Sequence, residues 1–186
     1  LGIKELSYLV KDLFFNRPKE ERKGNFSVTA SASCFVPKPF TPFQWVKQES
    51  IDEFTRKAYL VKDNIKDNKV TFNYHDAELS YVEAVFARGD RRLSEVLLEA
   101  WKKGCRFDGW SEHFKYDLWL EAFEDVSIDG DFYAIRDRDK DEIFPWDFID
   151  IGVSKKYLYR EYQKALSAVA CTGCGLQDCA MRGVFN

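Results

Sequence analysis

Apolar and polar residues alternate strictly over residues 25–36. Every second residue there is apolar: Phe26, Val28, Ala30, Ala32, Cys34 and Val36. Small hydroxylated residues stand between them: Ser27, Thr29, Ser31 and Ser33. This period of two predicts a strand with one apolar face and one hydroxyl-lined face. Three prolines follow at positions 37, 39 and 42, and because proline has a fixed φ and no backbone donor, we expect the strand to end in a stiff loop.

Helical spacing of apolar residues predicts a helix over residues 3–14 and a second over residues 50–66, where Ser50 and Glu53 form a capping box. Val70, Phe72 and Tyr74 alternate with polar residues and predict a second strand. The order helix, strand, helix, strand is typical of an α/β unit, and the second helix is long enough to be a crossover between parallel strands.

Only helices are predicted after residue 75. Apolar stripes and capping residues place them over residues 76–89 and 90–104, from Ser111 to about residue 123, and from Ser154 to residue 166. The sequence therefore predicts an α/β segment over residues 1–75, a helical extension over residues 76–170 and a cysteine-containing tail over residues 171–186.

Composition narrows the classes of function. The 186 residues are 45% hydrophobic and carry a formal net charge of −3, with no basic stripe of the kind that binds nucleic acid. No apolar run reaches the length of about 20 residues that a membrane span needs. Five cysteines, an odd number, and an N-terminal segment that is not a signal peptide favour reduced thiols in the cytoplasm.

Four sequence blocks, in order, resemble a family of radical S-adenosylmethionine proteins that usually carries an N-terminal cobalamin-binding domain. The blocks are PKPFTPFQW (37–45), AVFARGDRRL (84–93), GCRFDGWSEHF (104–114) and PWDFIDIGVSKKYLYREYQKAL (145–166). The resemblance implies that this chain is the C-terminal part of such a protein, of uncharacterised substrate. Its fold would be α/β, the end of a radical-SAM-type, partial TIM-like barrel followed by the mainly helical extension.

In that family, as the resemblance implies, a 4Fe-4S iron–sulfur cluster cleaves S-adenosylmethionine. The cluster needs three thiolates in a C-x3-C-x2-C spacing, and this spacing is absent here. We therefore expect the chain alone to be inactive. The missing N-terminal barrel strands and a cobalamin-type domain of the parent protein would complete it.

Candidate cofactor contacts lie where the first strand meets the proline loop. Hydroxyls that face a barrel lumen can bond a polar ligand, and Ser31, Ser33, Pro37 and Lys38 are the residues that we expect to contact the cofactor. The alternative is that the strand has a solvated face.

The tail reads CTGCGLQDC and places Cys171, Cys174 and Cys179 within nine residues, which suits zinc or an iron–sulfur cluster. The fourth ligand stays open among Cys105, His113, His75 and a residue further downstream. Capping or surface roles are the alternative for both histidines. Similarly, the charged turn Arg88–Arg92 either holds a phosphate or carboxylate or is a salt-bridged helix junction.

The alternative to an enzyme is a non-enzymatic interaction module with a structural zinc or iron–sulfur site in the tail. Under either interpretation, an open parallel sheet has an edge of unpaired backbone groups, so we expect self-association of the isolated chain.

Overall fold

The computed structural model describes residues 2–169, which fall into two compact units. The first unit contains the residues up to Phe35 together with Glu49–Ser80. The second contains Val36–Gln48 and the described residues from Tyr81 onward. The proline-rich loop, which the sequence groups with the barrel strands, thus lies in the second unit.

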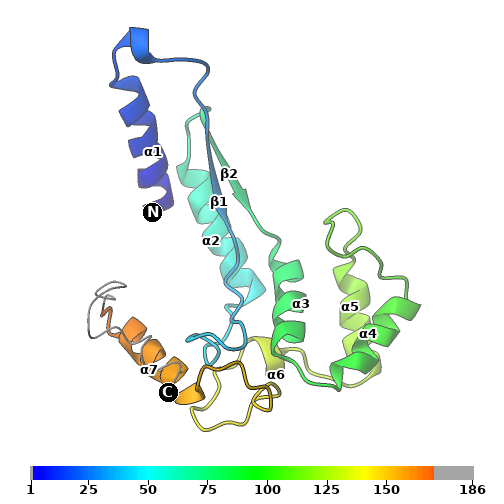
Figure 1. Cartoon of the computed structure of the whole chain (residues 1–186). Helices are drawn as coiled ribbons and strands as arrows, with labels where there is room; N and C mark the ends of the chain where they lie inside the picture. The colour runs from blue at the N-terminus through cyan, green and yellow to red at the C-terminus, as the bar shows by residue number, and fades with distance from the viewer. Residues whose placement is uncertain (1, 170–186) are drawn as a thin grey trace. The chain divides into compact units, whose positions relative to one another are not determined.

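The first unit is built around two parallel strands (Figure 1). Helix α1 (Gly2–Phe15) and a short 3-10 helix η1 (Lys19–Glu21) precede strand β1 (Val28–Ala32). Helix α2 (Ile51–Asn64) then leads to strand β2 (Val70–Tyr74). The register pairs Val28 with Val70 and Ala32 with Tyr74, so the predicted parallel pairing is confirmed.

Helix α2 begins where the sequence predicts it. The Ser50 hydroxyl accepts a hydrogen bond of 3.3 Å from the backbone N–H of Glu53, which satisfies one of the unpaired donors at the helix start. The Glu53 carboxylate bonds to Arg56 at 2.7 Å and pairs with Lys57. These two contacts hold the carboxylate on the outer face of the helix.

Both helices of this unit cover the same face of the sheet. Helix α1 packs on β1 and on α2, and α2 packs on β2. The apolar side chains of β1 are half-buried beneath them, and Val70 of β2 is buried. The predicted alternation is confirmed, because the hydroxyl side chains of residues 27, 29, 31 and 33 are all exposed.

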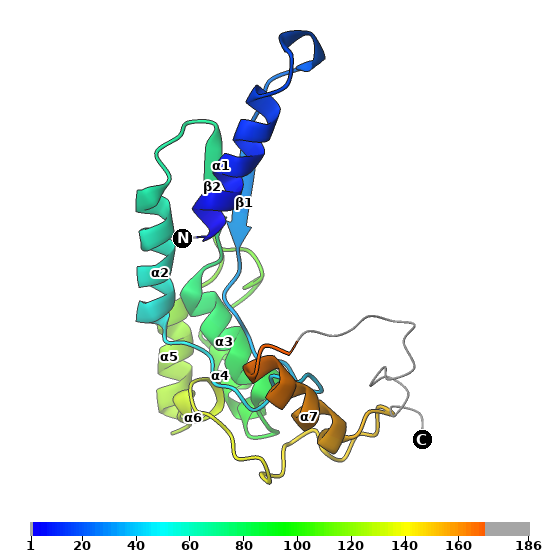
Figure 2. The ribbon, with the colours of Figure 1, turned by 90° about the vertical axis from the view of Figure 1, so that its left-hand side faces the viewer.

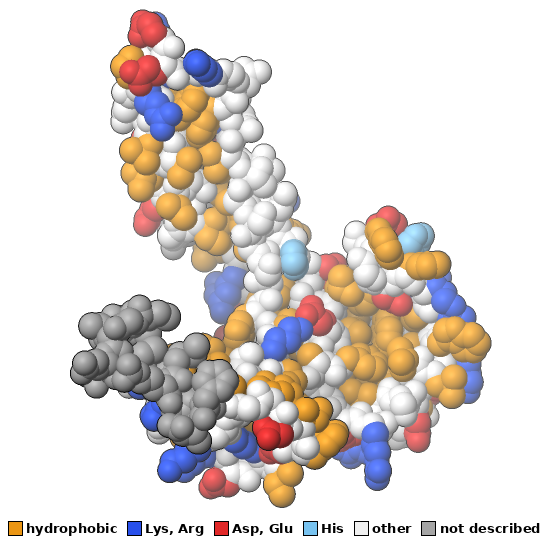
Figure 3. Space-filling view, viewed as in Figure 1, with side chains coloured by type: hydrophobic (Ala, Val, Ile, Leu, Met, Phe, Trp, Pro, Cys, Tyr) orange, Lys and Arg blue, Asp and Glu red, His pale blue; other side chains and the backbone are white. Residues whose placement is uncertain are grey.

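The apolar stripe of α1 is only partly covered: the Phe14 ring stacks on the Phe26 ring with centres 4.8 Å apart, but the leucines are not buried. Its leucines are largely exposed, with Leu6 at 62%, Leu9 at 54% and Leu13 at 59%. The buried position of the helix is instead Ser7, whose hydroxyl donates to the Ile3 carbonyl oxygen at 2.8 Å. The helix itself is as predicted, but its leucines are presented to solvent (Figure 3).

Helices dominate the rest of the described chain. They are α3 (Ala77–Arg88), α4 (Leu93–Lys102), α5 (Tyr116–Asp125), α6 (Asp131–Ala134) and α7 (Lys155–Leu166). Their shared apolar contacts bury small and branched side chains completely: Ala84, Val85, Val96, Ala100, Ala122 and Ala134. None of the helices within residues 2–169 combines the length and the apolar character that crossing a membrane requires.

A mainly aromatic cluster in the second unit packs against α7. Its buried members are Trp45, Phe144, Trp146 and, from α7 itself, Leu158. The side-chain oxygen of Gln44 accepts hydrogen bonds from the Trp146 indole N–H at 2.9 Å and from the Phe40 backbone N–H at 3.1 Å. These bonds hold the proline-rich loop against the segment before α7. Figure 2 shows the ribbon of α7 and of the segment that precedes it.

One predicted helix start is wrong. Helix α5 begins at Tyr116, not at Ser111. The segment before it makes single turns, in which the Phe114 N–H donates to the Trp110 carbonyl at 3.1 Å. Lys115, with φ −126° and ψ 84°, separates these turns from the helix, because its backbone is not helical. The predicted start at Ser154 is confirmed by its 3.1 Å bond from the Tyr157 N–H.

Candidate functional site

Six small polar side chains share the uncovered face of the two-stranded sheet. The register places Thr29 beside Thr71 and Ser31 beside Asn73, and Ser27 and Ser33 extend the row at either end. All six are exposed. Neighbouring strands lie about 4.8 Å apart, so adjacent hydroxyl and amide groups can bond to one ligand together. This polar sheet face offers hydrogen bonds without net charge.

Thr71 and Asn73 are absent from the candidates taken from the sequence. The signal was present, because the apolar alternation of residues 70, 72 and 74 puts the two residues between them on the opposite face. Their pairing with the hydroxyls of β1 became visible only with the parallel register.

The four predicted cofactor contacts do not belong to one unit. Ser31 and Ser33 lie on the polar sheet face of the first unit. Pro37 and Lys38 belong to the second, where Pro37 is buried and the Lys38 ammonium forms an ion pair with Glu83. Thus the first two residues are open to a ligand, whereas the charge of Lys38 has a partner within its own unit.

The helix-covered face of the sheet contains an apolar cavity of about 480 Å³ that the sequence did not indicate. Phe54 of α2, Phe72 and Tyr74 of β2, and the segment around Cys34 line it. The Cys34 thiol donates to the carbonyl oxygen of His75 at 3.8 Å. The helix and the sheet therefore leave space between them that an apolar group can fill.

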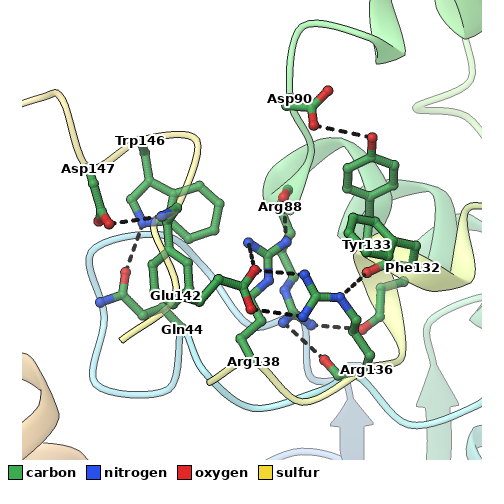
Figure 4. Close-up of polar contacts among 12 residues, drawn as sticks. Gln44, Arg88, Asp90, Phe132, Tyr133, Arg136, Arg138, Glu142, Trp146 and Asp147 are labelled. Atoms are coloured by element: carbon green, nitrogen blue, oxygen red, sulfur yellow. Dashed lines mark hydrogen bonds and ion pairs between the residues drawn. The ribbon is translucent and has the colours of Figure 1, made fainter. Parts of the chain in front are cut away.

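The charged turn Arg88–Arg92 is a helix junction (Figure 4). Arg88 is buried and donates through Nη1 to the Ala134 carbonyl oxygen at 2.7 Å. Arg92 is bonded to Asp90 at 2.7 Å, and this contact lowers the pKa of the Asp90 carboxyl to about 2. Of the two roles considered for this turn, an anion site and a salt-bridged helix junction, these contacts support the junction.

Two more arginines complete this polar core. Arg136 forms a two-pronged ion pair with Glu142, at 2.8 and 2.6 Å, which lowers the pKa of the Glu142 carboxyl. Arg138 is buried against the rings of Phe144 and Trp146. Burial, and secondarily the nearby Arg138, lowers the pKa of Arg88 to about 10.

No set of three possible metal ligands gathers within residues 2–169. Cys105 is buried, and desolvation followed by the charge of Asp108 raises the pKa of its thiol, which disfavours the thiolate that binds metal. The His75 backbone N–H donates to the Ala32 carbonyl at 3.1 Å, and the His113 ring lies 6.0 Å from the Phe107 ring. The predicted ligands Cys171, Cys174 and Cys179 lie outside the described residues.

Comparison with protein-family models, with curated proteins and with solved structures finds no significant match for this chain. The likeness to radical S-adenosylmethionine proteins therefore rests on the four sequence blocks.

Proposed function

We propose that this chain supplies the last strands of a radical S-adenosylmethionine barrel, and that its polar sheet face lines the reaction chamber. The observation that carries the proposal is the asymmetry of the sheet. Two helices cover one face, and the opposite face is bare and lined by six small polar side chains. In a β/α barrel the helices pack outside the strands and the other strand face points inward.

A sheet of two parallel strands also calls for further strands beside it. Parallel strands occur almost only in larger sheets that are covered by helices, and a pair of strands is marginal by itself. Among the described residues β1 and β2 pair only with each other, which leaves one edge of each strand without a strand partner. Barrel strands from outside this chain would pair with these edges.

The exposed leucines of α1 fit the same arrangement. Leu6, Leu9 and Leu13 are largely exposed on a helix that packs on the sheet. In the helical layer of a barrel, each helix packs against the next one in the ring, and an apolar stripe on its outer flank would be buried there.

The polar sheet face suits binding and orientation. When bound, S-adenosylmethionine and an iron–sulfur cluster would supply the radical chemistry. Ser31, Ser33, Thr71 and Asn73 offer donors and acceptors for the polar groups of such a cofactor or of a substrate. The cluster-binding triad is not in this chain, so the thiolates, and any cobalamin, would belong to other parts of the parent protein.

The cytoplasm is the compartment that we assign to the protein. Cys34 and Cys105 are free thiols, and Cys105 is buried. Free thiols and iron–sulfur chemistry both fit a reducing compartment.

The first test is to sequence the whole reading frame that contains this chain. We expect it to encode a C-x3-C-x2-C motif before residue 1, and a frame without this motif would overturn the proposal. The second test is the anaerobic protein made from the whole frame, assayed for cleavage of S-adenosylmethionine to 5′-deoxyadenosine. We expect Ser31→Val with Thr71→Val to weaken cofactor or substrate binding, while Ser167→Ala, an exposed serine in the second unit, leaves it unchanged.

An interaction module with structural zinc is the second candidate. The exposed leucines of α1 favour it, since a large apolar patch often marks a protein interface. A frame that lacks the cysteine triad, together with zinc in the purified protein, would support this function over the enzyme.

A further inference from the structure

A cavity of about 660 Å³ lies beside the start of α7, within the second unit. Four cations line it, namely Lys140, Lys155, Lys156 and Arg160, and Asp141 is the one carboxylate in the lining. The whole chain has a net charge of −3, so this concentration of positive charge is local. Cationic clefts attract anions.

The four cationic side chains differ in how many contacts they already make within the protein. The Lys155 ammonium bonds to Asp147 at 2.6 Å and to the Glu142 carbonyl oxygen. Lys140 lies 5.4 Å from the centre of the Tyr159 ring. Arg160 lies 5.2 Å from the centre of the Tyr157 ring, and its Nε is 3.7 Å from the Glu161 carboxylate, which leaves its terminal N–H groups for a ligand. Contacts with an aromatic face leave the N–H donors of these side chains able to bond an anion.

The start of α7 adds backbone donors. Lys156 and Arg160 are one turn apart on this 12-residue helix. The Ser154 hydroxyl satisfies the N–H of Tyr157, but the other first-turn N–H groups of a helix have no intrahelical acceptor. Helix starts of this kind favour negative charge.

Trp45 provides an independent indication of a ligand. It lines the cavity, its side chain is 3% exposed, and its indole N–H has no hydrogen-bond partner among the described residues. Trp146 in the same aromatic cluster has its N–H bonded to Gln44 at 2.9 Å. A buried indole N–H usually has a partner, so the unpaired donor of Trp45 points to a missing acceptor. The nitrogen is itself buried, so a ligand oxygen reaches it only when the side chains that cover it move.

We propose that this cavity binds the phosphate groups of a nucleoside phosphate, with the base against its aromatic walls. Lys156, Lys140 and Arg160 would contact the phosphates, and Arg160 would do so while its Nε stays 3.7 Å from the Glu161 carboxylate. Trp45, Tyr157 and Tyr159 supply aromatic surface, and the volume lies within the range of about 300–1,000 Å³ that small-ligand sites occupy. The site is in a different unit from the polar sheet face, and the proposal does not depend on a barrel.

Titration calorimetry of the full 186-residue chain at low salt tests the proposal, with ATP, pyrophosphate and adenosine as separate probes. We expect ATP to bind most tightly, pyrophosphate more weakly and adenosine most weakly. Failure of both ATP and pyrophosphate to bind at millimolar concentration would overturn the proposal. Equal affinity for ATP and pyrophosphate would show that the aromatic walls do not bind the base. Equal affinity for ATP and adenosine would show that the cations do not bind the phosphates.

Matched variants locate the binding. Lys156→Gln with Arg160→Gln removes two exposed charges from the cavity and should weaken ATP binding at least tenfold. The control Lys164→Gln removes a charge from the same helix, at a residue that pairs with Glu161 and does not line the cavity, and should leave the affinity unchanged. Equal weakening by the control would show nonspecific attraction and refute the site.

Trp45→Phe removes the indole donor and keeps an aromatic ring in the cluster. Loss of one hydrogen bond of about 1 kcal/mol corresponds to roughly fivefold weaker ATP binding. Circular dichroism would establish that the variant remains folded. An unchanged affinity in the folded variant would contradict the assignment of the indole N–H to the ligand.

Discussion

Arg138 caps the C-terminal end of α3 by donating from Nη2 to the carbonyl oxygen of Arg88, at 2.7 Å. Arg88 is the last residue of the helix, and its carbonyl is among the groups that lack an intrahelical donor. A guanidinium at this position also opposes the negative end of the helix dipole. The Arg138 guanidinium therefore interacts favourably with the backbone of Arg88, although the two guanidinium charges repel each other.

Replacing the two arginines should have unequal effects on stability. Arg138→Met removes the cap of α3 and the contacts with Phe144 and Trp146, and we expect it to cost about 2–3 kcal/mol in the free energy of unfolding. Arg88→Met removes the bond to Ala134 but also a desolvated charge, so it should cost about 1 kcal/mol. The Ala134 carbonyl keeps its bond from the Gln48 N–H.

Urea denaturation followed by circular dichroism measures both variants. Lys102→Met, on the exposed face of α4, is the control and should change the free energy by less than about 0.5 kcal/mol. A larger cost for Arg88→Met than for Arg138→Met would show that the cap is not the dominant contribution.

The second unit should lose stability in acid. The bond from Arg136 lowers the pKa of Glu142, and the bond from Arg92 lowers the pKa of Asp90 from 3.8 to about 2. A carboxylate with a lowered pKa in the folded state stabilises the fold above its unfolded pKa. This contribution is lost as the pH falls through the folded pKa. We therefore expect the loss to begin near pH 4.5 and to continue to about pH 2.

Denaturation at a series of pH values checks this expectation. Glu142→Gln with Asp90→Asn should flatten the dependence between pH 4.5 and 2 and lower the stability at pH 7. Asp63→Asn, a substitution in the first unit, is the control and should leave the slope of the second unit unchanged. A double variant with the wild-type slope would contradict the assignment of acid sensitivity to these two groups.

The sequence predicted what depends on local pattern. The alternation around Ala30 gave the first strand and its two faces, and the capping serines at positions 50 and 154 gave the starts of two helices. The start at Ser111 was wrong because serine is common in turns as well as at helix caps, and here the chain turns before Lys115.

Long-range relationships could not be predicted in the same way. The spacing in α1 predicts an amphipathic helix, but which side is covered depends on its neighbours, and its sheet-side buried residue is Ser7. Arginine is mostly a surface residue, so nothing in the local pattern marks Arg88 and Arg138, 50 positions apart, as a buried pair. The polar sheet face was half predicted, because Thr71 and Asn73 join it only through the parallel register.

The isolated chain should self-associate through the first unit. The exposed leucines at positions 6, 9 and 13 and the unpaired strand edges are both surfaces that attract a partner. Sedimentation velocity over a hundredfold range of concentration should show a rising average mass. Replacing the three leucines by Gln should reduce that rise, whereas Ile143→Gln, an exposed apolar residue in the second unit, should not. A strict monomer at all concentrations would refute the expectation.

The cysteines of the tail should bind metal in the intact protein. Thiolates with two and with four residues between them, among which are Gly173 and Gly175, can converge on one ion, and this expectation rests on the sequence alone. Iron, sulfide and zinc would be assayed after anaerobic purification, before and after Cys174→Ala. Metal content should fall in this variant and stay constant in Cys34→Ala, since Cys34 is a free thiol of the first unit. Equal metal content in all three proteins would contradict the prediction.

The two helix-capping serines test whether the two units unfold independently. Ser50 caps α2 in the first unit through a 3.3 Å bond, and Ser154 caps α7 in the second through a 3.1 Å bond. Each replacement by Ala removes an acceptor from exposed helix-start N–H groups and should cost about 1 kcal/mol. If the units unfold separately, Ser50→Ala lowers the midpoint of one calorimetric transition and Ser154→Ala that of the other. If both variants lower a single shared transition, the units unfold as one cooperative structure, and the division seen in the fold is not a thermodynamic one.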